Sequence, residues 1–382
     1  MGQVKGTKRV RGESWQLRVS LGRDPVTGKA RYRTETYKGS SRDADRRLGE
    51  MVKDAGRDGS PATMTTYAEL LDRWWEAARE NLSPSTVRAQ THIISCYIKP
   101  NIGNVPLAKL DTATIDRFYR RLRKEGGAAG RALSPSSVHR VRDVVRKSLG
   151  QAVKWGWIQT NPALGATPPS AIAPDLRPPE PVEVTRIIHA ARETNPALAV
   201  ALRLAAATGM RRGEVVALRW SAIDLDRAVL TVRRGIVEDD EGNLVEKSTK
   251  THAVRRLALD VGTVDILREH RTSVEKVAAE LGVKLARDSF VFSHDPTGRE
   301  CWRPDYVTHA FIVLTKRLGI EGVRLHDLRH YVATTLLTKG IDVRTVAGRL
   351  GHRSASMTLN VYAAFMPVAD QQAADVMGSA FE

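Results

Sequence analysis

A proline-rich stretch divides this chain more firmly than any other feature of its sequence. Residues 161–181 hold seven prolines and show almost no hydrophobic pattern. Because proline lacks a backbone N–H and fixes φ, such a stretch suits neither a helix interior nor a central strand. We therefore expect an extended, semi-stiff linker, placed at residues 166–181. A second break, rich in glycine, serine and proline, spans residues 56–62.

These two breaks predict three domains in a chain of 382 residues, namely residues 1–60, 61–165 and 182–382. A hydrophobic content of 42% with 27% charged residues is ordinary for a soluble globular protein. No apolar run approaches the ~20 residues that a membrane span requires. The predicted fold class is mainly α with small β-sheets (α+β).

The first domain is expected to form a three-stranded sheet with one helix. Residues 14–39 alternate between apolar and polar side chains, with a turn at residues 24–28. Ser40 and Ser41 then cap a helix that runs to about Ala55. Basic side chains on or beside the strands suit contact with a DNA groove, and a merely solvated sheet face explains them equally well: Arg18, Lys29, Arg31 and Arg33.

The second domain is expected to be a four-helix unit. Its helices begin at Thr65, Ser83-Pro84, Asp111 and Ser134-Pro135, where capping side chains and first-turn prolines suit a helix N-terminus. The last two helices carry a dense set of basic residues, which indicates phosphate contact or, alternatively, a solvated face. These residues are Arg117, Arg120, Arg121, Arg123, Lys124, His139, Arg140, Arg142, Arg146 and Lys147.

The third domain combines helices with a small amount of sheet. Helices are predicted over residues 181–194 and 196–208, the second apolar almost all round and so buried. Residues 229–237 and 244–259 alternate as strands, joined by a turn at 238–243. The rest is expected to be helical, apart from a short strand at Phe290-Val291-Phe292.

The net charge of +17 indicates a polyanionic partner, although charge alone does not separate DNA from RNA or acidic lipid. Residues 1–60 carry 15 Lys/Arg against 8 Asp/Glu, and residues 61–165 carry 16 against 8. The remainder is nearly balanced. Two distant cysteines, Cys96 and Cys301, and a basic N-terminus without an apolar core favour a reducing, cytoplasmic location over secretion.

The last quarter of the chain gathers groups that suit metal-free phosphoryl chemistry. His326, Arg329, His352 and Tyr362 lie within 37 residues, without the carboxylate cluster of a metal-dependent nuclease. A phenol can attack phosphorus if arginine and histidine take up the charge that develops on the phosphoryl oxygens. We hypothesise that Tyr362 attacks a DNA phosphodiester in this way.

Three residues further upstream complete the candidate set. Gly209 allows a sharp turn after a buried helix, which leaves Arg211 at the mouth of a pocket with paired donors for a phosphate. Glu214 lies one helical turn on and suits a supporting role that holds Arg211. Lys250 lies at or near a hairpin turn between the predicted strands.

Each of these residues also has an ordinary explanation. Arginines often follow helix C-caps, and a single lysine is usually a surface residue. Tyr306 and Tyr331 compete with Tyr362, because a tyrosine on an amphipathic helix is usually a core residue. His326 and His330, four apart, are compatible with zinc, although Arg329 between them adds a cation where the metal would lie.

The ordered set Arg211, Lys250, His326, Arg329, His352 and Tyr362 resembles the tyrosine recombinase family, in particular the phage and mobile-element integrases. The matching motifs are TGMRRGE, the lysine in a strand hairpin, HDLRH, LGH, and a tyrosine ten residues later. They span about 155 residues, and the likeness extends in outline to the three-part division. That division would correspond to an arm-type DNA-binding domain, a helical core-binding domain and a catalytic domain. One departure is Tyr331, where a small hydroxyl residue is usual.

The resemblance implies a role for each residue. Tyr362 would attack the scissile phosphate and leave a 3′-phosphotyrosyl link, with Arg211 and Arg329 binding the non-bridging oxygens. Lys250 would protonate the departing 5′-oxygen. His326 would assist proton transfer from the tyrosine, and His352 would hydrogen-bond the phosphate. The link conserves bond energy, so the resemblance implies neither a metal nor another cofactor.

The resemblance also implies partners. The apolar tail after Tyr362 would pack on a neighbouring subunit, giving a homotetramer on paired attachment sites in double-stranded DNA. Directionality or host DNA-bending factors would be further partners. Two rival functions remain at this point: a type IB topoisomerase that rejoins the original strand, and a DNA-binding accessory factor without catalysis.

Overall fold

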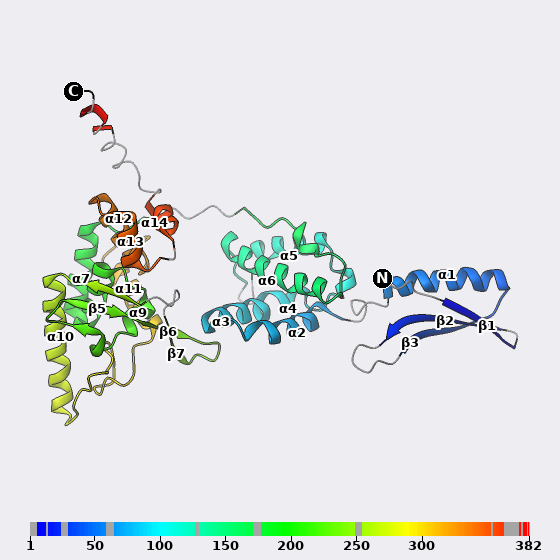
Figure 1. The fold of residues 1–382 in the computed structure, drawn as a ribbon, viewed down its shortest axis with the longest axis horizontal. Coiled ribbons are helices and arrows are strands. Elements are labelled where there is room, and N and C mark those ends of the chain that lie inside the picture. Colours follow the sequence, from blue (N-terminus) through cyan, green and yellow to red (C-terminus); the bar gives the residue numbers. More distant parts are fainter. Residues whose placement is uncertain are drawn as a thin grey trace. The chain divides into compact units, whose positions relative to one another are not determined.

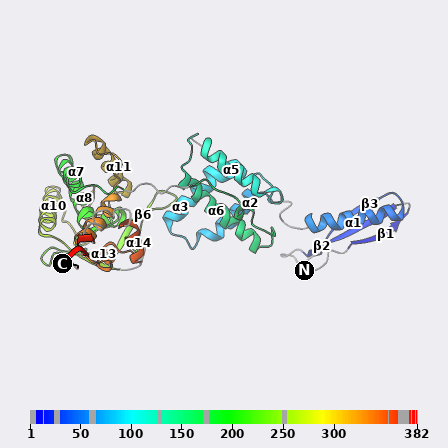
Figure 2. The same ribbon diagram turned by 90° about the horizontal axis from the view of Figure 1, so that it is seen from above.

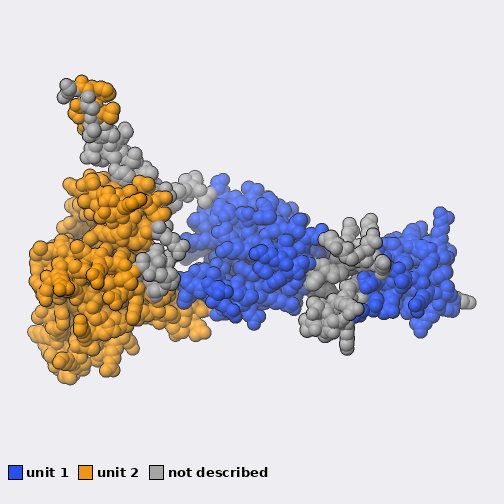
Figure 3. Space-filling model, in the orientation of Figure 1, with its two compact units in different colours: residues 1–173 blue, residues 174–382 orange. Residues whose placement is uncertain are grey.

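The computed structural model describes residues 6–12, 14–23, 30–58, 65–126, 130–170, 177–248, 254–352, 354–362, 374–375, 377–379 and 381. The chain forms two compact units, residues 1–173 and 174–382 (Figure 3). The predicted fold class is confirmed, because helices predominate and the sheets are small and antiparallel. Among the described helices, none combines the length and the apolar character needed to cross a membrane.

A three-stranded antiparallel sheet with one helix opens the first unit (Figures 1 and 2). Leu17 and Val19 of the central strand pack against Ala44 and Met51 of the helix and form a small core of their own. Ser40 accepts a hydrogen bond from the backbone N–H of Asp43 at 3.2 Å, as expected of a cap. The elements are β1 (Gly6–Arg11), β2 (Ser14–Arg23), β3 (Ala30–Tyr37) and α1 (Ser41–Asp58). The helix therefore continues past residue 56, where the sequence predicted a linker.

A helical bundle with a separate core completes the first unit. The predicted caps at Asp111 and Ser134 are confirmed, since their side chains accept from the N–H groups of Thr114 and Ser137. The predicted cap at Thr65 is wrong, because Thr66 forms the capping box with Glu69. The helices are α2 (Tyr67–Arg79), α3 (Pro84–Ile93), a π-helical turn (Ile94–Ile98), α4 (Lys99–Ile102), α5 (Thr112–Lys124) and α6 (Pro135–Lys154).

The start of the proline-rich stretch belongs to this bundle and is not extended linker. Ala163 and Ala166 are buried in the bundle core, and residues 162–164 form a 3-10 turn. The N–H of Thr167 donates to Asp116 at 2.8 Å, and His139 contacts the carbonyl of Pro169 at 2.8 Å. Two alanines between the prolines are thus enough to attach the segment to the bundle core. The proline-rich composition does not reveal this contact.

The second unit is built of helices around two small sheets. One sheet has the strand order β4-β5-β8 and the other pairs β6 with β7. The helices are α7 (Pro181–Thr194), α8 (Pro196–Thr208), α9 (Arg212–Val216), α10 (Val261–Glu280), α11 (Pro304–Arg317), α12 (Asp327–Thr338), α13 (Val343–Leu350) and α14 (Ala355–Tyr362). The strands are β4 (Ile223–Asp224), β5 (Val229–Val232), β6 (Arg234–Glu238), β7 (Leu244–Ser248) and β8 (Arg255–Ala258).

Three strand predictions in this unit are wrong in detail. The predicted strand at 244–259 includes β7 and β8, which pair in different sheets, and its residues 249–253 lie outside the described residues. The predicted strand at 229–237 breaks at Arg233, so its two halves pair in different sheets. Phe290 forms only an isolated bridge with Arg219, and residues 290–292 form no strand. The aromatic side chains of this run are nevertheless buried. The short apolar run therefore predicted a core position correctly, but not the hydrogen bonding of its backbone.

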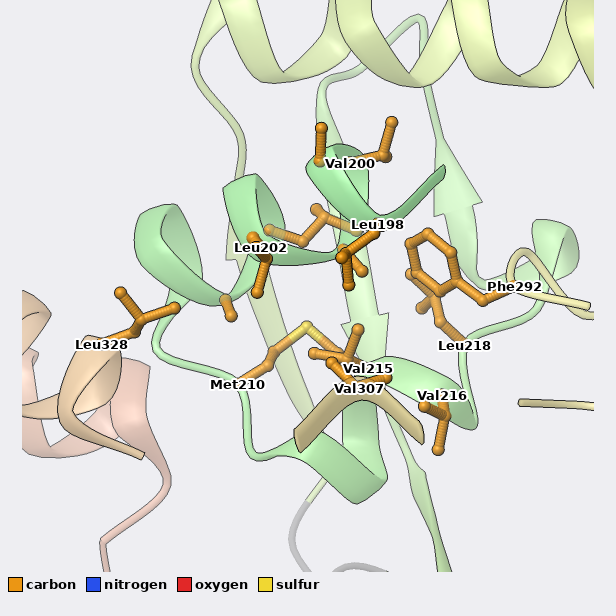
Figure 4. Packing of buried hydrophobic residues seen from close by; sticks show 14 of the residues in the cluster. Leu198, Val200, Leu202, Met210, Val215, Val216, Leu218, Phe292, Val307 and Leu328 are labelled. Atoms are coloured by element: carbon orange, nitrogen blue, oxygen red, sulfur yellow. The ribbon is translucent and has the colours of Figure 1, made fainter. Parts of the chain in front are cut away.

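Helix α8 forms the centre of the core of the second unit. It is buried on almost every side, as the sequence predicts, and packs against α7, α10 and α12. Figure 4 shows Met210, just after the end of α8, directed into this cluster beside Leu202 and Val215. The residue before Arg211 is thus held in apolar packing, which fixes the start of α9.

The contact between α9 and β6 predicts opposite effects for two Gly→Ala substitutions. A Cβ added at Gly213 would lie 2.5 Å from the backbone carbonyl oxygen of Ile236, whereas a Cβ at Gly348 in α13 would have no atom of the described residues within 4 Å. In Gly348→Ala the lower backbone entropy of the unfolded chain should raise the free energy of unfolding by about 0.5–1 kcal/mol. In Gly213→Ala the forced separation of α9 from β6 should lower it by about 1–3 kcal/mol. Urea denaturation measures both, and equal effects would contradict the packing described.

Candidate functional site

The end of α8 positions the first residue of the candidate site. Gly209 adopts the left-handed conformation with φ 68° and caps the helix, as the sequence predicts. A Cβ at this position would lie 2.2 Å from Cδ2 of Leu350, which is itself fully buried. Glycine is therefore required both by the backbone conformation and by the close approach of α13.

Arg211 follows this turn as the N-cap residue of α9 and is held by three hydrogen bonds. Its backbone N–H and its Nη1 each donate to Glu214 at 2.9 Å, to Oε2 and Oε1 respectively. Its Nη2 donates to the carbonyl of Gly351 at 3.3 Å. The side chain remains 27% exposed. The guanidinium is thus oriented by protein groups while part of it still faces solvent.

Glu214 holds a second arginine that the sequence analysis missed. Arg255, at the start of β8, donates from Nη1 to Oε1 at 3.2 Å and from Nη2 to Oε2 at 2.6 Å. The side chains are only 8% and 5% exposed. Burial alone would raise the pKa of Glu214, but the hydrogen bonds from Arg255, with its charge and that of Arg211, hold this pKa below its ordinary value. The carboxylate therefore stays ionised between two guanidinium groups.

A signal for Arg255 was present in the sequence. In β8 residues alternate, and Arg255 shares the buried face with Leu257 while Arg256 faces outward. A charged residue on the inward face of a strand requires a buried partner, since an unpaired buried charge is costly. The same alternation that predicts the strand therefore also indicates a buried partner for Arg255.

Arg329 is the most deeply buried of the candidate cations that the structure describes. It lies in α12 with 4% exposure, and its Nη1 donates to the carbonyl of Gly209 at 2.6 Å. Its Nη2 has no hydrogen-bond partner among the described residues. Burial, reinforced by the charge of Arg211, lowers its pKa to about 9. The group is still cationic at neutral pH, and it keeps donor capacity for an anion.

His326 and His330, four apart in the sequence, lie close together at the start of α12. His326 is the N-cap residue of α12, which begins at Asp327. The two rings meet edge to face with centroids 5.1 Å apart. Local desolvation of the ring has the largest effect on the pKa of His326, and the nearby His330 and Arg329 act in the same direction. Together they lower this pKa to about 4, although the residue as a whole is exposed. The imidazole is therefore neutral at physiological pH.

His352 reaches the same region from the end of α13. It follows Gly351, which caps that helix in the left-handed conformation with φ 67°. Its Nδ1 lies 2.8 Å from Oγ1 of Thr358, a fully buried residue of α14. Burial and the charges of Arg329 and Arg211 lower the pKa of His352 to about 4. This histidine is also neutral, and it links α13 to α14.

Two of the predicted site residues are described only in part or not at all. Tyr362 is the last residue of α14, and only its backbone is described. Lys250 lies outside the described residues, between the end of β7 at Ser248 and the start of β8 at Arg255. Of the competing tyrosines, Tyr306 has its hydroxyl 2.8 Å from Nδ2 of Asn195, and Tyr331 packs against the core.

The described residues converge on one region. The positive charge of Arg211 influences the pKa of Arg329, His326 and His352, and Arg329 influences both histidines, so these groups lie within electrostatic reach of one another. They come from the ends of α8 and α13 and from α12. Two oriented guanidinium groups with neutral imidazoles nearby suit a phosphate diester, which needs paired donors and proton acceptors.

The lowered pKa values predict that folding stability falls in mild acid. For His352 the folded-state pKa is about 4, against about 6.5 in an unfolded chain. Between these values the unfolded chain binds more protons, so the contribution is complete above about pH 6.5 and is lost as the pH falls towards 4. Urea denaturation from pH 7.5 to 4.5 should show a shallower decline in His352→Gln. The exposed His189 is the control, and an equal change in His189→Gln would contradict this account.

Comparison with known proteins places the chain in a family. Residues 180–367 match the phage integrase family, and residues 66–123 match the N-terminal SAM-like domain of phage integrases. A tyrosine recombinase XerC-like protein of Caldanaerobacter subterraneus is 24% identical over 391 residues and covers 97% of both chains. The ICEBs1 integrase of Bacillus subtilis is 24% identical, covering 96% of this chain and 98% of its own.

Solved structures show the same fold. The Tn1549 transposon integrase in complex with transposon right end DNA has a TM-score of 0.69 at 16% identity, covering 82% of this chain and all of that one. The lambda integrase dimer bound to a COC′ core site has a TM-score of 0.59 at 21% identity, covering 93% of this chain and 94% of that one. The sequence motifs, the two family matches and the full-length relatives agree: the chain belongs to the phage integrase family and is a tyrosine recombinase.

Proposed function

We propose that this chain is a site-specific DNA recombinase that integrates or excises a mobile element through a 3′-phosphotyrosyl intermediate. The observation that carries the proposal is the convergence of Arg211, Arg329, His326 and His352 beside α14, the helix that ends at Tyr362. Helix α14 packs against α12 and α13. Arg329 lies in α12, His326 directly precedes α12, and His352 follows the Gly351 cap of α13.

The two arginines bind the non-bridging oxygens of the scissile phosphate in this proposal. Guanidinium groups provide paired donors, and both of these are cationic at neutral pH. The Nη2 of Arg329, which has no hydrogen-bond partner in the described part of the chain, and the partly exposed guanidinium of Arg211 support this role. Each is anchored to a backbone carbonyl, so little reorganisation is needed when negative charge develops in the transition state.

Tyr362 is the nucleophile of the proposed reaction. Residues four apart share one face of a helix, and Thr358 in α14 contacts His352, so the position of Tyr362 on that face supports the assignment. The phenol oxygen forms a bond to phosphorus, the bond from phosphorus to the 5′-oxygen breaks, and the phenol proton is taken up with the help of neutral His326. We propose that Lys250 donates a proton to the departing 5′-oxygen, which leaves a free 5′-hydroxyl.

Double-stranded DNA is the partner in this proposal, and the bundle of the first unit supports it. Exposed cations line α5 and α6, and within the described ranges Arg140, Arg146 and Lys147 have no ion pair with a carboxylate. Unpaired surface cations can bind phosphates without first breaking a salt bridge. The bacterial origin of the two full-length relatives supports action in the cytoplasm of a bacterial host.

A homotetramer on paired sites, with tail exchange between subunits, is part of the same proposal. Met377 and Phe381 in the described part of the tail are exposed, four positions apart, as expected of residues that pack on another subunit. A lambda integrase tetramer bound to a Holliday junction shares this fold with a TM-score of 0.56 at 21% identity. Accessory bending or directionality factors would act on this assembly.

A strand-exchange assay with two DNA sites tests the proposed function. Tyr362→Phe should bind DNA but form no covalent adduct, because the variant lacks the attacking oxygen. Tyr331→Phe is the matched control, since it removes another hydroxyl of the same unit, and it should form the adduct. An adduct formed by Tyr362→Phe, or lost in Tyr331→Phe, would overturn the assignment of the nucleophile.

The same assay separates the rival functions and tests the tail. A recombinase exchanges strands between two sites, a topoisomerase only relaxes one supercoiled circle, and an accessory factor makes no adduct. A chain that ends at residue 367 should still cleave single sites while it synapses paired sites poorly. Unchanged synapsis by the shortened chain would remove the tail from the assembly.

A further inference from the structure

We propose that Arg255 is a positioning residue that holds Arg211 in the geometry needed to bind the scissile phosphate and keeps the surrounding group of side chains positively charged. The inference rests on the proposed role of Arg211 as a phosphate ligand. Arg255 itself is nine-tenths buried, so it acts through Glu214 and Gly351 and not on the substrate.

The Glu214 carboxylate is the first connection between the two arginines. Its Oε1 accepts from Nη1 of both Arg211 and Arg255, at 2.9 and 3.2 Å. Its Oε2 accepts from the backbone N–H of Arg211 at 2.9 Å and from Nη2 of Arg255 at 2.6 Å. Four donors therefore fix one carboxylate, and removal of Arg255 would leave it held from one side only.

Gly351 is the second connection. A Cβ added there would lie 2.9 Å from Nη1 of Arg255 and 3.3 Å from its Cζ, so the end of α13 packs directly on this guanidinium. The carbonyl of the same Gly351 accepts from Nη2 of Arg211. Arg255 thus contacts both groups that hydrogen-bond the Arg211 guanidinium, and His352 follows Gly351 in the chain.

The positive charge of Arg255 also affects how strongly Arg211 attracts an anion. A carboxylate paired with Arg211 alone would make a neutral pair and weaken the attraction of Arg211 for an anion. Shared between two guanidinium groups, the same carboxylate leaves the three side chains with a net positive charge. The carboxylate remains available for orientation, and the phosphate still meets a cation.

A purely structural ion pair is the alternative, and a neighbouring arginine supplies the control. Arg349 of α13 is also partly buried, and its Nη2 donates to the carbonyls of Ala207 and Ala258 at 2.9 and 3.2 Å. Among the described contacts it has none with Glu214 or Arg211. Arg349→Met removes a partly buried cation of the same unit that has no described contact with the proposed phosphate ligand.

The test compares two DNA substrates in single-turnover covalent cleavage by the full-length protein. One carries a normal scissile phosphate, and the other carries a methylphosphonate, in which a methyl group replaces one non-bridging oxygen and removes the charge. On the normal substrate Arg255→Met should lower the cleavage rate at least about tenfold, as expected when an oriented donor to the developing charge is disturbed. On the methylphosphonate the loss should nearly vanish, because no charged oxygen needs Arg211. DNA affinity should change little, and Arg349→Met should cleave both substrates at the wild-type rate.

Equal losses by Arg255→Met on both substrates, or no loss on either, would overturn the proposal. If Arg255→Met does not fold, Arg255→Lys decides by the same ratio of losses, because lysine keeps a charge but cannot bridge both carboxylate oxygens. Failure of the proposed function gives a different result, since the wild-type protein itself would then form no adduct with the normal substrate.

Discussion

The site depends on a buried carboxylate that is shared by two guanidinium groups. Arg211, Arg255 and Arg329 lie close enough to influence one another electrostatically. Without a negative charge among them, the three guanidinium groups would repel one another. Glu214 supplies that negative charge from within the protein, with hydrogen bonds from two of the three arginines. Buried ion pairs persist only where the geometry satisfies both partners, and removing one partner leaves an uncompensated charge. We therefore regard the ion pair of Glu214 and Arg255 as the frame on which the phosphate-binding arginines are arranged.

Helix ends supply the rest of the arrangement. The last carbonyls of a helix have no partner within it and lie at the negative end of its dipole, so they suit a cationic side chain. Arg329 donates to the carbonyl of Gly209 at the end of α8, and Arg211 donates to that of Gly351 at the end of α13. Both glycines adopt the left-handed conformation that turns the chain sharply at these points. Two helix C-termini thus orient two cations towards one region, and α14 is joined to it through His352 and Thr358.

Local chemistry in the sequence was sufficient for much of the fold and for the left-handed turn at Gly209. Helix starts at Asp111 and Ser134 were predictable because a capping side chain acts within three residues of the helix that it begins. Long-range contacts were not predictable in this way. The strand over 229–237 breaks because its halves pair with different partners, and the segment after Asn161 docks because Ala163 and Ala166 meet a core built elsewhere. The alternation of β8 marks Arg255 as buried, but its partner Glu214 lies 41 residues away and does not follow from that local pattern.

The central claim is that Tyr362 becomes joined to broken DNA beside Arg211 and Arg329. The most direct measurement traps the covalent complex on a nicked substrate, digests the protein and identifies the DNA-linked peptide by mass spectrometry. The account predicts a 3′-phosphate on the peptide that contains Tyr362. A linkage on a peptide that contains Tyr306 or Tyr331, or a linkage through a 5′-phosphate, would contradict it.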